Sequence, residues 1–274
     1  MEIKVSIIRR LARASRHPIF FARWIRGRLR HYLLLPLWPL WPLRVIFERG
    51  WLENAFVALF VSRKSQSVSD REVVLRTLLK LISPDARVLE IGTYFGEGTT
   101  KVFIDELSNQ ASFFVMDKWS EYISATDKAK GRFFRVMDGM SYFAATNTLR
   151  MIREEERIKD SPSITMIRRS SDDLFVADNF FDLVFIDGSH YYENVRRDIE
   201  FALRILKPGG IICGDDLEIL PSADLAAVAK QHLDQDYISD PDGVYFHPGV
   251  ALAVYELLGT VEMKAGTWWK VTTK

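Results

Sequence analysis

Two apolar runs in this 274-residue sequence end in acidic side chains that could bind a cation. Asp187 follows FDLVFI, and Asp215 and Asp216 follow IICG. Carboxylates at neighbouring strand ends repel one another unless a positive charge lies between them, and hard divalent cations such as Mg²⁺ prefer oxygen ligands. We therefore expect Asp187, Asp215 and Asp216 to hold a metal ion. The alternative is a metal-free site in which one of these carboxylates orients an acceptor.

His190 lies three residues after Asp187, which places it beside the expected metal. Its ordinary pKa of about 6.5 suits a general base that removes a proton from a hydroxyl group. The alternative is a role as a helix cap or as a support for the metal ligands. The other histidines are interpreted as structural or solvated: His17, His31, His232 and His247.

A glycine-rich turn follows a third apolar run. In VLEIGTYFGEGTT (88–100) the run ends in Glu90, and glycines stand at 92, 96 and 98. Glycine lacks a Cβ, so it accepts positive φ and lets a ligand approach the backbone. The spacing is not the G-x-G-x-x-G of dinucleotide binders. The pattern predicts a cofactor-binding turn between a strand and a helix; the alternative is a turn that needs glycines for its geometry alone.

Asp117 follows the run SFFVM. A carboxylate at this place can accept hydrogen bonds from both hydroxyls of a ribose. The alternative is a surface aspartate that caps the next segment. The segment Lys118–Met140 is expected to be an insert that contributes to an acceptor pocket. Its mixture of aromatic and basic residues is compatible with a sugar or an anionic lipid-linked glycan.

Strands must alternate with helices to bring these residues together. The sequence predicts an α/β fold: a Rossmann-like, doubly wound, mostly parallel seven-stranded sheet covered by helices on both faces. The expected strands are 87–91, 112–116, 164–167, 181–186, 210–213, 250–257 and 268–272. The expected helices are 51–61, 71–82, 99–107, 142–158, 191–206 and 223–233. Ligands of such sheets bind at the carboxyl ends of the strands.

Three of these segments resemble the class I S-adenosylmethionine-dependent methyltransferases. They are VLEIGTYFGEGTT, FDLVFIDGSHYYENVRRDI and LKPGGIICGDDL. Within that class, the Asp of one strand and the acidic pair of the next resemble the macrocin O-methyltransferase and cephalosporin-hydroxylase-like group. His247–Gly259 is similar to the C-terminal hairpin region of that group. The resemblance covers about residues 71–270.

The resemblance implies which residues bind S-adenosylmethionine. They are Glu90, Gly92, Thr93, Gly96, Gly98, Asp117, Ser171 and Asp172. Ser171 lies where relatives often have Gly-Asp-Ser, although Arg169 and Ser170 depart from that pattern. Asp172 fits equally well as a cap for the helix that follows.

The resemblance also implies the reaction, which is O-methylation of a hydroxyl on a sugar, glycan or natural product, assisted by Mg²⁺. Asp187 and His190 are the expected catalytic residues. Two other functions stay open: an NAD-dependent oxidoreductase, and a non-catalytic cofactor-binding scaffold at a membrane. No iron-binding group of two histidines and one carboxylate is evident from the sequence.

The N-terminal segment 1–61 differs in composition from the rest of the chain. Residues 1–44 contain ten Lys/Arg and one acid, and an aromatic and apolar run follows at 32–47. This composition suits the surface of an anionic membrane, while three prolines and Arg44 exclude a spanning helix of about 20 apolar residues. The alternative is a helical arm that packs on the catalytic domain or joins a homo-oligomer. We expect no nucleic-acid binding.

The expected division of the chain is an arm at 1–61, a linker at 62–70 and a methyltransferase domain at 71–274. The single cysteine is Cys213. One cysteine excludes an internal disulfide and a cysteine-based zinc site. We therefore expect a cytoplasmic protein, peripheral at the inner face of the membrane if the arm binds lipid.

Overall fold

The computed structural model describes residues 69–157, 160–240 and 243–273. The predicted arm at 1–61, its helix at 51–61 and most of the linker lie outside these residues, so their roles stay predictions. Ser69 and Asp70, expected in the linker, begin the first described helix, α5 (Ser69–Leu79). In the described part of the chain, no helix has the length and apolar character needed to cross a membrane.

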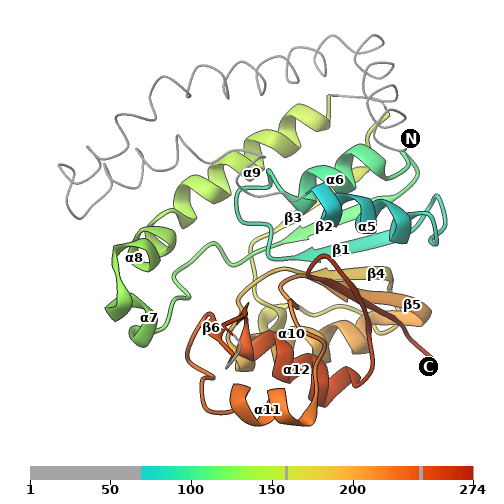
Figure 1. The fold of residues 1–274 in the computed structure, drawn as a ribbon. Helices are drawn as coiled ribbons and strands as arrows, with labels where there is room; N and C mark the ends of the chain where they lie inside the picture. Colours follow the sequence, from blue (N-terminus) through green and yellow to red (C-terminus); the bar gives the residue numbers. More distant parts are fainter. Residues whose placement is uncertain (1–68, 158–159, 241–242, 274) are drawn as a thin grey trace.

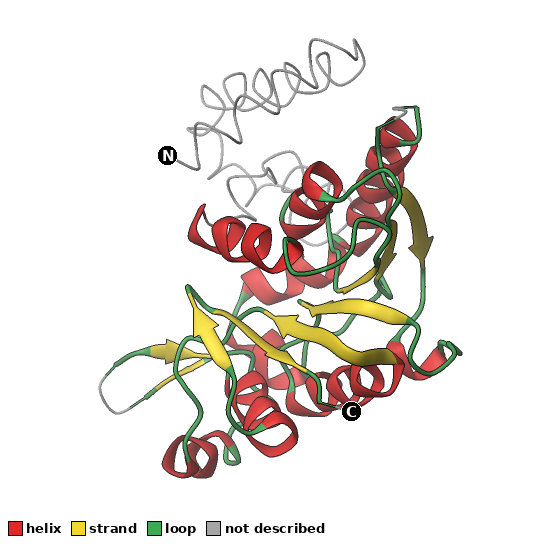
Figure 2. Ribbon diagram, turned by 90° about the vertical axis from the view of Figure 1, so that its right-hand side faces the viewer, coloured by secondary structure: helices red, strands yellow, loops and turns green. Residues whose placement is uncertain are grey.

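A seven-stranded sheet forms the centre of the described structure (Figures 1 and 2), which confirms the predicted Rossmann-like fold. Its strand order is β3-β2-β1-β4-β5-β9-β8. The strands are β1 (Arg87–Ile91), β2 (Ser112–Met116), β3 (Ser163–Ile167), β4 (Phe181–Ile186), β5 (Leu206–Gly214), β8 (Glu262–Lys264) and β9 (Thr267–Val271). The first five are parallel to one another, and β9 runs antiparallel to both β5 and β8.

Helices cover both faces of the sheet (Figure 1). One layer contains α5, α6 (Thr99–Glu106) and α9 (Ser141–Glu155), and the other contains α10 (Tyr192–Ile205), α11 (Ala223–Ala229) and α12 (Pro248–Leu258). Side chains of a strand point alternately to the two faces. The strand β4 therefore sends Leu183 and Phe185 into one core and Val184 and Ile186 into the other. Both faces are apolar, as a parallel sheet requires.

The region predicted as a strand at 250–257 is a helix. This is an error of the sequence analysis, and the hairpin expected at His247–Gly259 is wrong for the same reason. Five consecutive residues of the run, Val250–Val254, are apolar because α12 is packed between α10 and α11. The run therefore shows neither the periodic spacing of apolar residues in an amphipathic helix nor the apolar–polar alternation of a strand. Two signals did mark a helix: Pro248 lies in its first turn, and Gly259, directly after its end, has a φ of 63°. Proline at the start and glycine after the end are typical of helices. The seventh strand is instead β8.

Strand register determines where the chemistry lies. Ile91 pairs with Met116 on one side and with Ile186 on the other, and Ile186 pairs with Gly214. The residues that follow these four therefore form a row along the carboxyl edge of the sheet: Gly92, Asp117, Asp187 and Asp215. Strand order reverses between β1 and β4. Such a reversal is the place where these sheets bind ligands.

Gly92 is required by the close approach of β1 and β4. Its φ is 91°, and a Cβ on this residue would lie 2.0 Å from the carbonyl oxygen of Asp187. We expect Gly92→Ala to lower the free energy of unfolding by about 3 kcal/mol, because it adds a backbone collision to the cost of positive φ. Urea unfolding of the purified protein measures this loss.

Gly209→Ala is the matched control for that substitution. Gly209 also has a positive φ, 77°, but a Cβ there would meet nothing within 4 Å. Gly209→Ala should lower the free energy of unfolding by only about 1 kcal/mol. Equal losses in the two variants would show that the contact with Asp187 does not matter.

Candidate active site

Asp117 organises the glycine turn that follows β1. Its carboxylate accepts hydrogen bonds from the backbone N–H of Tyr94 at 2.8 Å and of Trp119 at 2.6 Å. Both donors have positive φ, 46° and 43°. The carboxylate thus holds two uncommon backbone conformations in place. Trp119 also donates its indole N–H to the carbonyl oxygen of Tyr94 at 2.8 Å. Burial raises the pKa of Asp117, and these backbone N–H groups oppose that rise.

Glu90 lies fully buried beneath the same turn. Two threonine hydroxyls donate to it, Thr99 at 2.5 Å and Thr93 at 3.4 Å. Burial raises the pKa of Glu90 to about 7, and the hydroxyl donors partly offset this effect. Burial acts in this direction because it disfavours the charged form of a carboxyl. Thr93 therefore contacts the carboxylate predicted to act beside it, and Gly96 and Gly98 complete the turn that leads into α6.

The two residues predicted after β3 have different surroundings. Ser171 is buried and donates to Asp198 of α10 at 2.6 Å, whereas Asp172 is paired with Arg197 at the surface. Burial raises the pKa of Asp198 to about 7. Asp198, which the sequence analysis did not single out, is thus a second buried carboxyl on this side of the site. Only its place on an otherwise apolar helix face could have indicated it.

Asp215 is paired with an arginine and does not join Asp187 and Asp216 in a group of potential metal ligands. Its side chain is 1% exposed, and its Oδ2 is paired with the guanidinium of Arg71 from α5. The same guanidinium lies 3.8 Å from Asp187. The positive charge that the carboxylates require is therefore supplied in part by Arg71. Sequence reasoning missed this residue because its helix lies far from β5 along the chain.

His190 lies between two carboxylates. Its Nε2 is 2.9 Å from Asp216 and its Nδ1 is 2.8 Å from Asp236. Burial acts against a charge on the ring, but Asp216 and then Asp236 outweigh it and raise the pKa of His190 well above the usual value. An imidazole between two carboxylates carries a proton on each nitrogen. His190 can therefore act as the predicted base only when Nε2 is no longer hydrogen-bonded to Asp216.

The fold adds His247 and Glu218 to this cluster. The rings of His190 and His247 have centroids 4.4 Å apart, and Nδ1 of His247 is 2.9 Å from Glu218. Sequence reasoning treated His247 as structural, and it found no group of two histidines and one carboxylate. His190, His247 and Asp236 nevertheless form such a group, with donor atoms within 4.8 Å of one another. The incorrect strand at 250–257 had hidden this proximity.

The segment 118–140 holds Asp236 in position. It forms α7 (Ala125–Lys130) and α8 (Arg132–Gly139). Asp127 of α7, fully buried, accepts hydrogen bonds from the backbone N–H of Asp236 at 2.7 Å and from the hydroxyl of Tyr191 at 2.8 Å. The predicted insert is therefore fastened to the loop that carries Asp236, directly beside His190.

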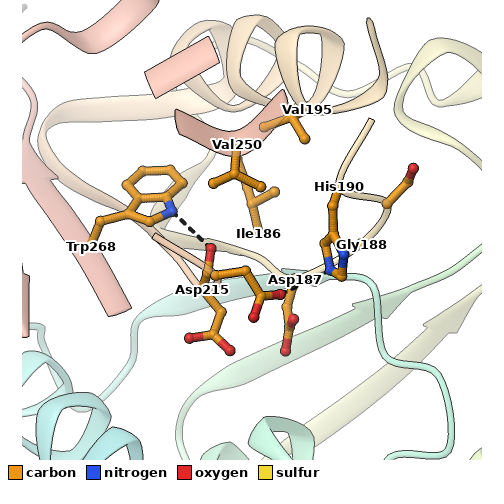
Figure 3. Close-up of a pocket in the computed structure, with 10 residues that line it drawn as sticks. Ile186, Asp187, Gly188, His190, Val195, Asp215, Val250 and Trp268 are labelled. Carbon is orange, nitrogen blue, oxygen red and sulfur yellow. Dashed lines mark hydrogen bonds and ion pairs between the residues drawn. The ribbon is translucent and has the colours of Figure 1, made fainter. Parts of the chain in front are cut away.

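A small cavity lies under the strand ends, where Asp187, Asp215 and His190 come from β4 and β5 and the loops after them (Figure 3). The cavity has a volume of about 10 Å³. That is room for about one water or ion. Its far wall is apolar, formed by Val195, Val250 and Trp268. A nucleoside cofactor must therefore bind along the edge of the sheet, outside this cavity.

The donor groups fit a nucleoside cofactor and, in part, the predicted metal. Asp117 accepts from two backbone N–H groups. An ionised carboxylate has about four lone pairs, so the others can accept from ribose hydroxyls. Asp187 and Asp216 fit a divalent cation, since their donor atoms lie with that of His190 within 4.8 Å. Asp215 lies against Arg71 instead, and His190 lies beside the two carboxylates.

Comparison with protein families agrees with this geometry. Residues 89–217 match the family model Methyltransf_24, described as a methyltransferase domain. The matched segment is less than half of the chain. It contains every residue predicted for the cofactor and the metal, from Glu90 to Asp216. Arg71, Asp236 and His247 of the candidate site lie outside the matched segment. None of the curated proteins matches the chain.

Several solved structures are similar to the chain at 18% identity. A provisionally assigned O-methyltransferase from Klebsiella pneumoniae has a TM-score of 0.47 and covers 90% of this chain and 97% of its own. The O-methyltransferase TomG from Streptomyces achromogenes, in complex with SAM, has a TM-score of 0.44, and the match covers 74% of this chain and 79% of TomG. An O-methyltransferase from Bacillus cereus, in complex with SAH, has a TM-score of 0.42, and the match covers 74% of this chain and 80% of that protein. At this level of similarity they assign no substrate to this chain.

The pairing of Arg71 with Asp215 can be tested by stability. We expect Arg71→Met to lower the free energy of unfolding by about 3 kcal/mol, because it leaves a buried carboxylate without its cation. In the background of Asp215→Asn the same substitution should cost about 1 kcal/mol. Urea unfolding of the four proteins gives the coupling.

An exposed arginine provides the control. Arg196 pairs with Glu193 and Glu200 on the surface of α10. Because surface ion pairs contribute little, Arg196→Met should change the free energy of unfolding by less than about 0.5 kcal/mol. If Arg71→Met were equally costly with and without the Asp215 carboxylate, the ion pair would not be the cause.

The buried carboxyl of Glu90 should make stability depend on pH. Its pKa is about 7 in the folded protein, against about 4.5 for the exposed group. Between these values the folded state binds the extra proton, so stability falls as pH rises from 5 to 7, by at most about 1.4 kcal/mol per pH unit. Glu90→Gln cannot lose a proton, and its melting temperature relative to the natural protein should rise over this range.

Glu262→Gln removes an exposed carboxyl on β8 and supplies the baseline for that titration. Melting curves without ligand at pH 5, 6 and 7 make the comparison. A difference between Glu90→Gln and the natural protein that stays constant across these pH values would contradict the buried, proton-binding state of Glu90.

Proposed function

We propose that this protein transfers the methyl group of S-adenosylmethionine to a hydroxyl oxygen. The observation that carries the proposal is the row at the carboxyl edge of the sheet, inside the matched methyltransferase domain. In that row the glycine turn and Asp117 stand next to Asp187 and the histidine–carboxylate cluster. A cofactor half and an acceptor half therefore meet at one edge.

The cofactor half consists of the turn at 92–98 with Glu90, Asp117 and Ser171 around it. Both oxygens of Asp117 are held by backbone N–H groups. They keep acceptor capacity, so Asp117 receives the ribose hydroxyls. Asn147 of α9 donates to the carbonyl oxygen of Phe95 at 2.6 Å, and Thr148 donates to that of Tyr94 at 2.9 Å. The turn is thus braced from α9 before any ligand binds.

The acceptor half consists of Asp187, Asp216 and His190. Asp216 would help to hold a divalent cation, which when bound lowers the pKa of the acceptor hydroxyl, and Asp187 lies beside it. Asp236 anchors Nδ1 of His190, so the ring presents Nε2 toward Asp216 and the acceptor side. Nε2 takes the proton of the hydroxyl, and Asp236 stabilises the imidazolium that results.

Aromatic side chains beside this cluster suit a ring-shaped acceptor such as a sugar or a natural product. The ring of Tyr237 lies 6.4 Å from that of His247 and 6.0 Å from that of Tyr245. Both tyrosines are exposed, Tyr237 at 42% and Tyr245 at 67%. They offer apolar ring faces next to the groups that would activate a hydroxyl.

Binding of S-adenosylhomocysteine tests the cofactor half. We expect the full-length chain to bind it in calorimetric titration and to be stabilised by it in thermal melts. Asp117→Ala should weaken binding at least about tenfold, because charged hydrogen bonds to the ribose are lost. The same protein, screened against hydroxylated glycans, lipids and phenols with and without a divalent cation, should then methylate one class of acceptor.

Asp224→Ala, at an exposed position in the first turn of α11, controls for loss of a carboxyl and should bind normally. Stabilisation by NAD alone would refute the methyltransferase assignment. Cofactor binding without transfer to any acceptor class would favour the non-catalytic scaffold instead.

A further inference from the structure

Every group of potential metal ligands in the described part of the chain contains a histidine. The three groups are Asp187–His190–Asp216, His190–Asp236–His247 and Asp216–Glu218–His247, each with donor atoms within 4.8 Å of one another. We propose that the third group is a cation site for a borderline first-row transition ion, of the class Mn²⁺, Fe²⁺, Co²⁺ or Zn²⁺. This site differs from the all-aspartate magnesium site that the sequence predicts.

The ligand chemistry favours such an ion. Magnesium takes oxygen ligands and keeps several waters, whereas imidazole suits zinc, iron and related ions. Asp216 and Glu218 supply oxygens, and His247 supplies a nitrogen. In divalent sites the donor atoms lie about 2.0–2.2 Å from the metal. Donors already within 4.8 Å of one another therefore need only small side-chain rotations to close on one ion.

The backbone already fixes this juxtaposition. Asp216 and Glu218 are two residues apart in the loop after β5, and His247 caps α12. The backbone N–H of His247 donates to Glu218 at 3.2 Å. A Cβ on Gly249 would lie 2.2 Å from the carbonyl oxygen of His190, so α12 must begin directly against His190. These contacts do not depend on the conformations of the imidazole rings.

The third group is also the most open of the three. The side chains of Glu218 and Asp216 are 31% and 22% exposed. This exposure leaves room for an ion to enter and for water or substrate to complete its coordination. A cation there also draws Asp216 away from His190. Nε2 then becomes available, while Asp236 keeps hold of Nδ1. The inference rests on the proposed function for this role, but the site itself is defined by metal binding alone.

Cobalt binding tests the site without any methyl transfer. We expect the metal-free full-length chain to bind one Co²⁺, with visible absorption that reports nitrogen ligation, and to release it to Zn²⁺ but not to a large excess of Mg²⁺. His247→Ala and Glu218→Gln should each weaken Co²⁺ binding by about 10- to 100-fold. Melting curves identify folded variants, and Glu218→Gln serves if His247→Ala does not fold.

The other two groups each contain one carboxylate that the proposed site does not use. Asp187→Asn and Asp236→Asn should therefore bind Co²⁺ within about threefold of the natural protein, as should the control His232→Gln, since none removes a ligand. Loss of binding in Asp187→Asn or Asp236→Asn with normal binding in Glu218→Gln would overturn the proposal. So would a preference for Mg²⁺ over Co²⁺. A failed methyl-transfer screen would bear on the proposed function only.

Discussion

The parallel register of β2, β1, β4 and β5 is the constraint on which the rest of the site depends. Once Ile91 pairs with both Met116 and Ile186, and Ile186 pairs with Gly214, the residues after each strand must share one edge. Gly92 permits this register because a Cβ there would collide with the backbone of Asp187. The glycine turn and the acidic cluster are neighbours for this reason, although they lie far apart along the chain.

Charge balance is the second condition that the edge must meet. Carboxylates from several loops gather there, and buried or partly buried anions need partners. Arg71 is paired with Asp215 and lies farther from Asp187. His190 contacts Asp216 and Asp236. His247 contacts Glu218. These partners come from α5, from the loop after β4 and from the start of α12. The candidate metal ligands from these elements therefore share one network of charged groups.

Much of the fold was predictable from the sequence because the apolar runs of a parallel sheet are distinct. The strands at 87–91, 112–116 and 181–186 occur with the predicted bounds, since each is a short run closed by polar or glycine residues. The segment at 250–257 forms a helix in which five consecutive residues, Val250–Val254, are all buried. Its prediction failed because such a helix has no amphipathic period. That single error also concealed His247, which caps this helix and lies against His190.

The sequence by itself determined the fold class, the glycine turn and the identity of the carboxylates at the strand ends. These features follow from local composition and from the rule that parallel strands carry their ligands at one edge. Only the tertiary structure decided which of the carboxylates meet. Asp216 turns toward His190, while Asp215, its neighbour, turns toward Arg71. Adjacent residues leave a strand end in different directions, and their partners come from helices and loops far away in the chain, so spacing alone cannot assign them.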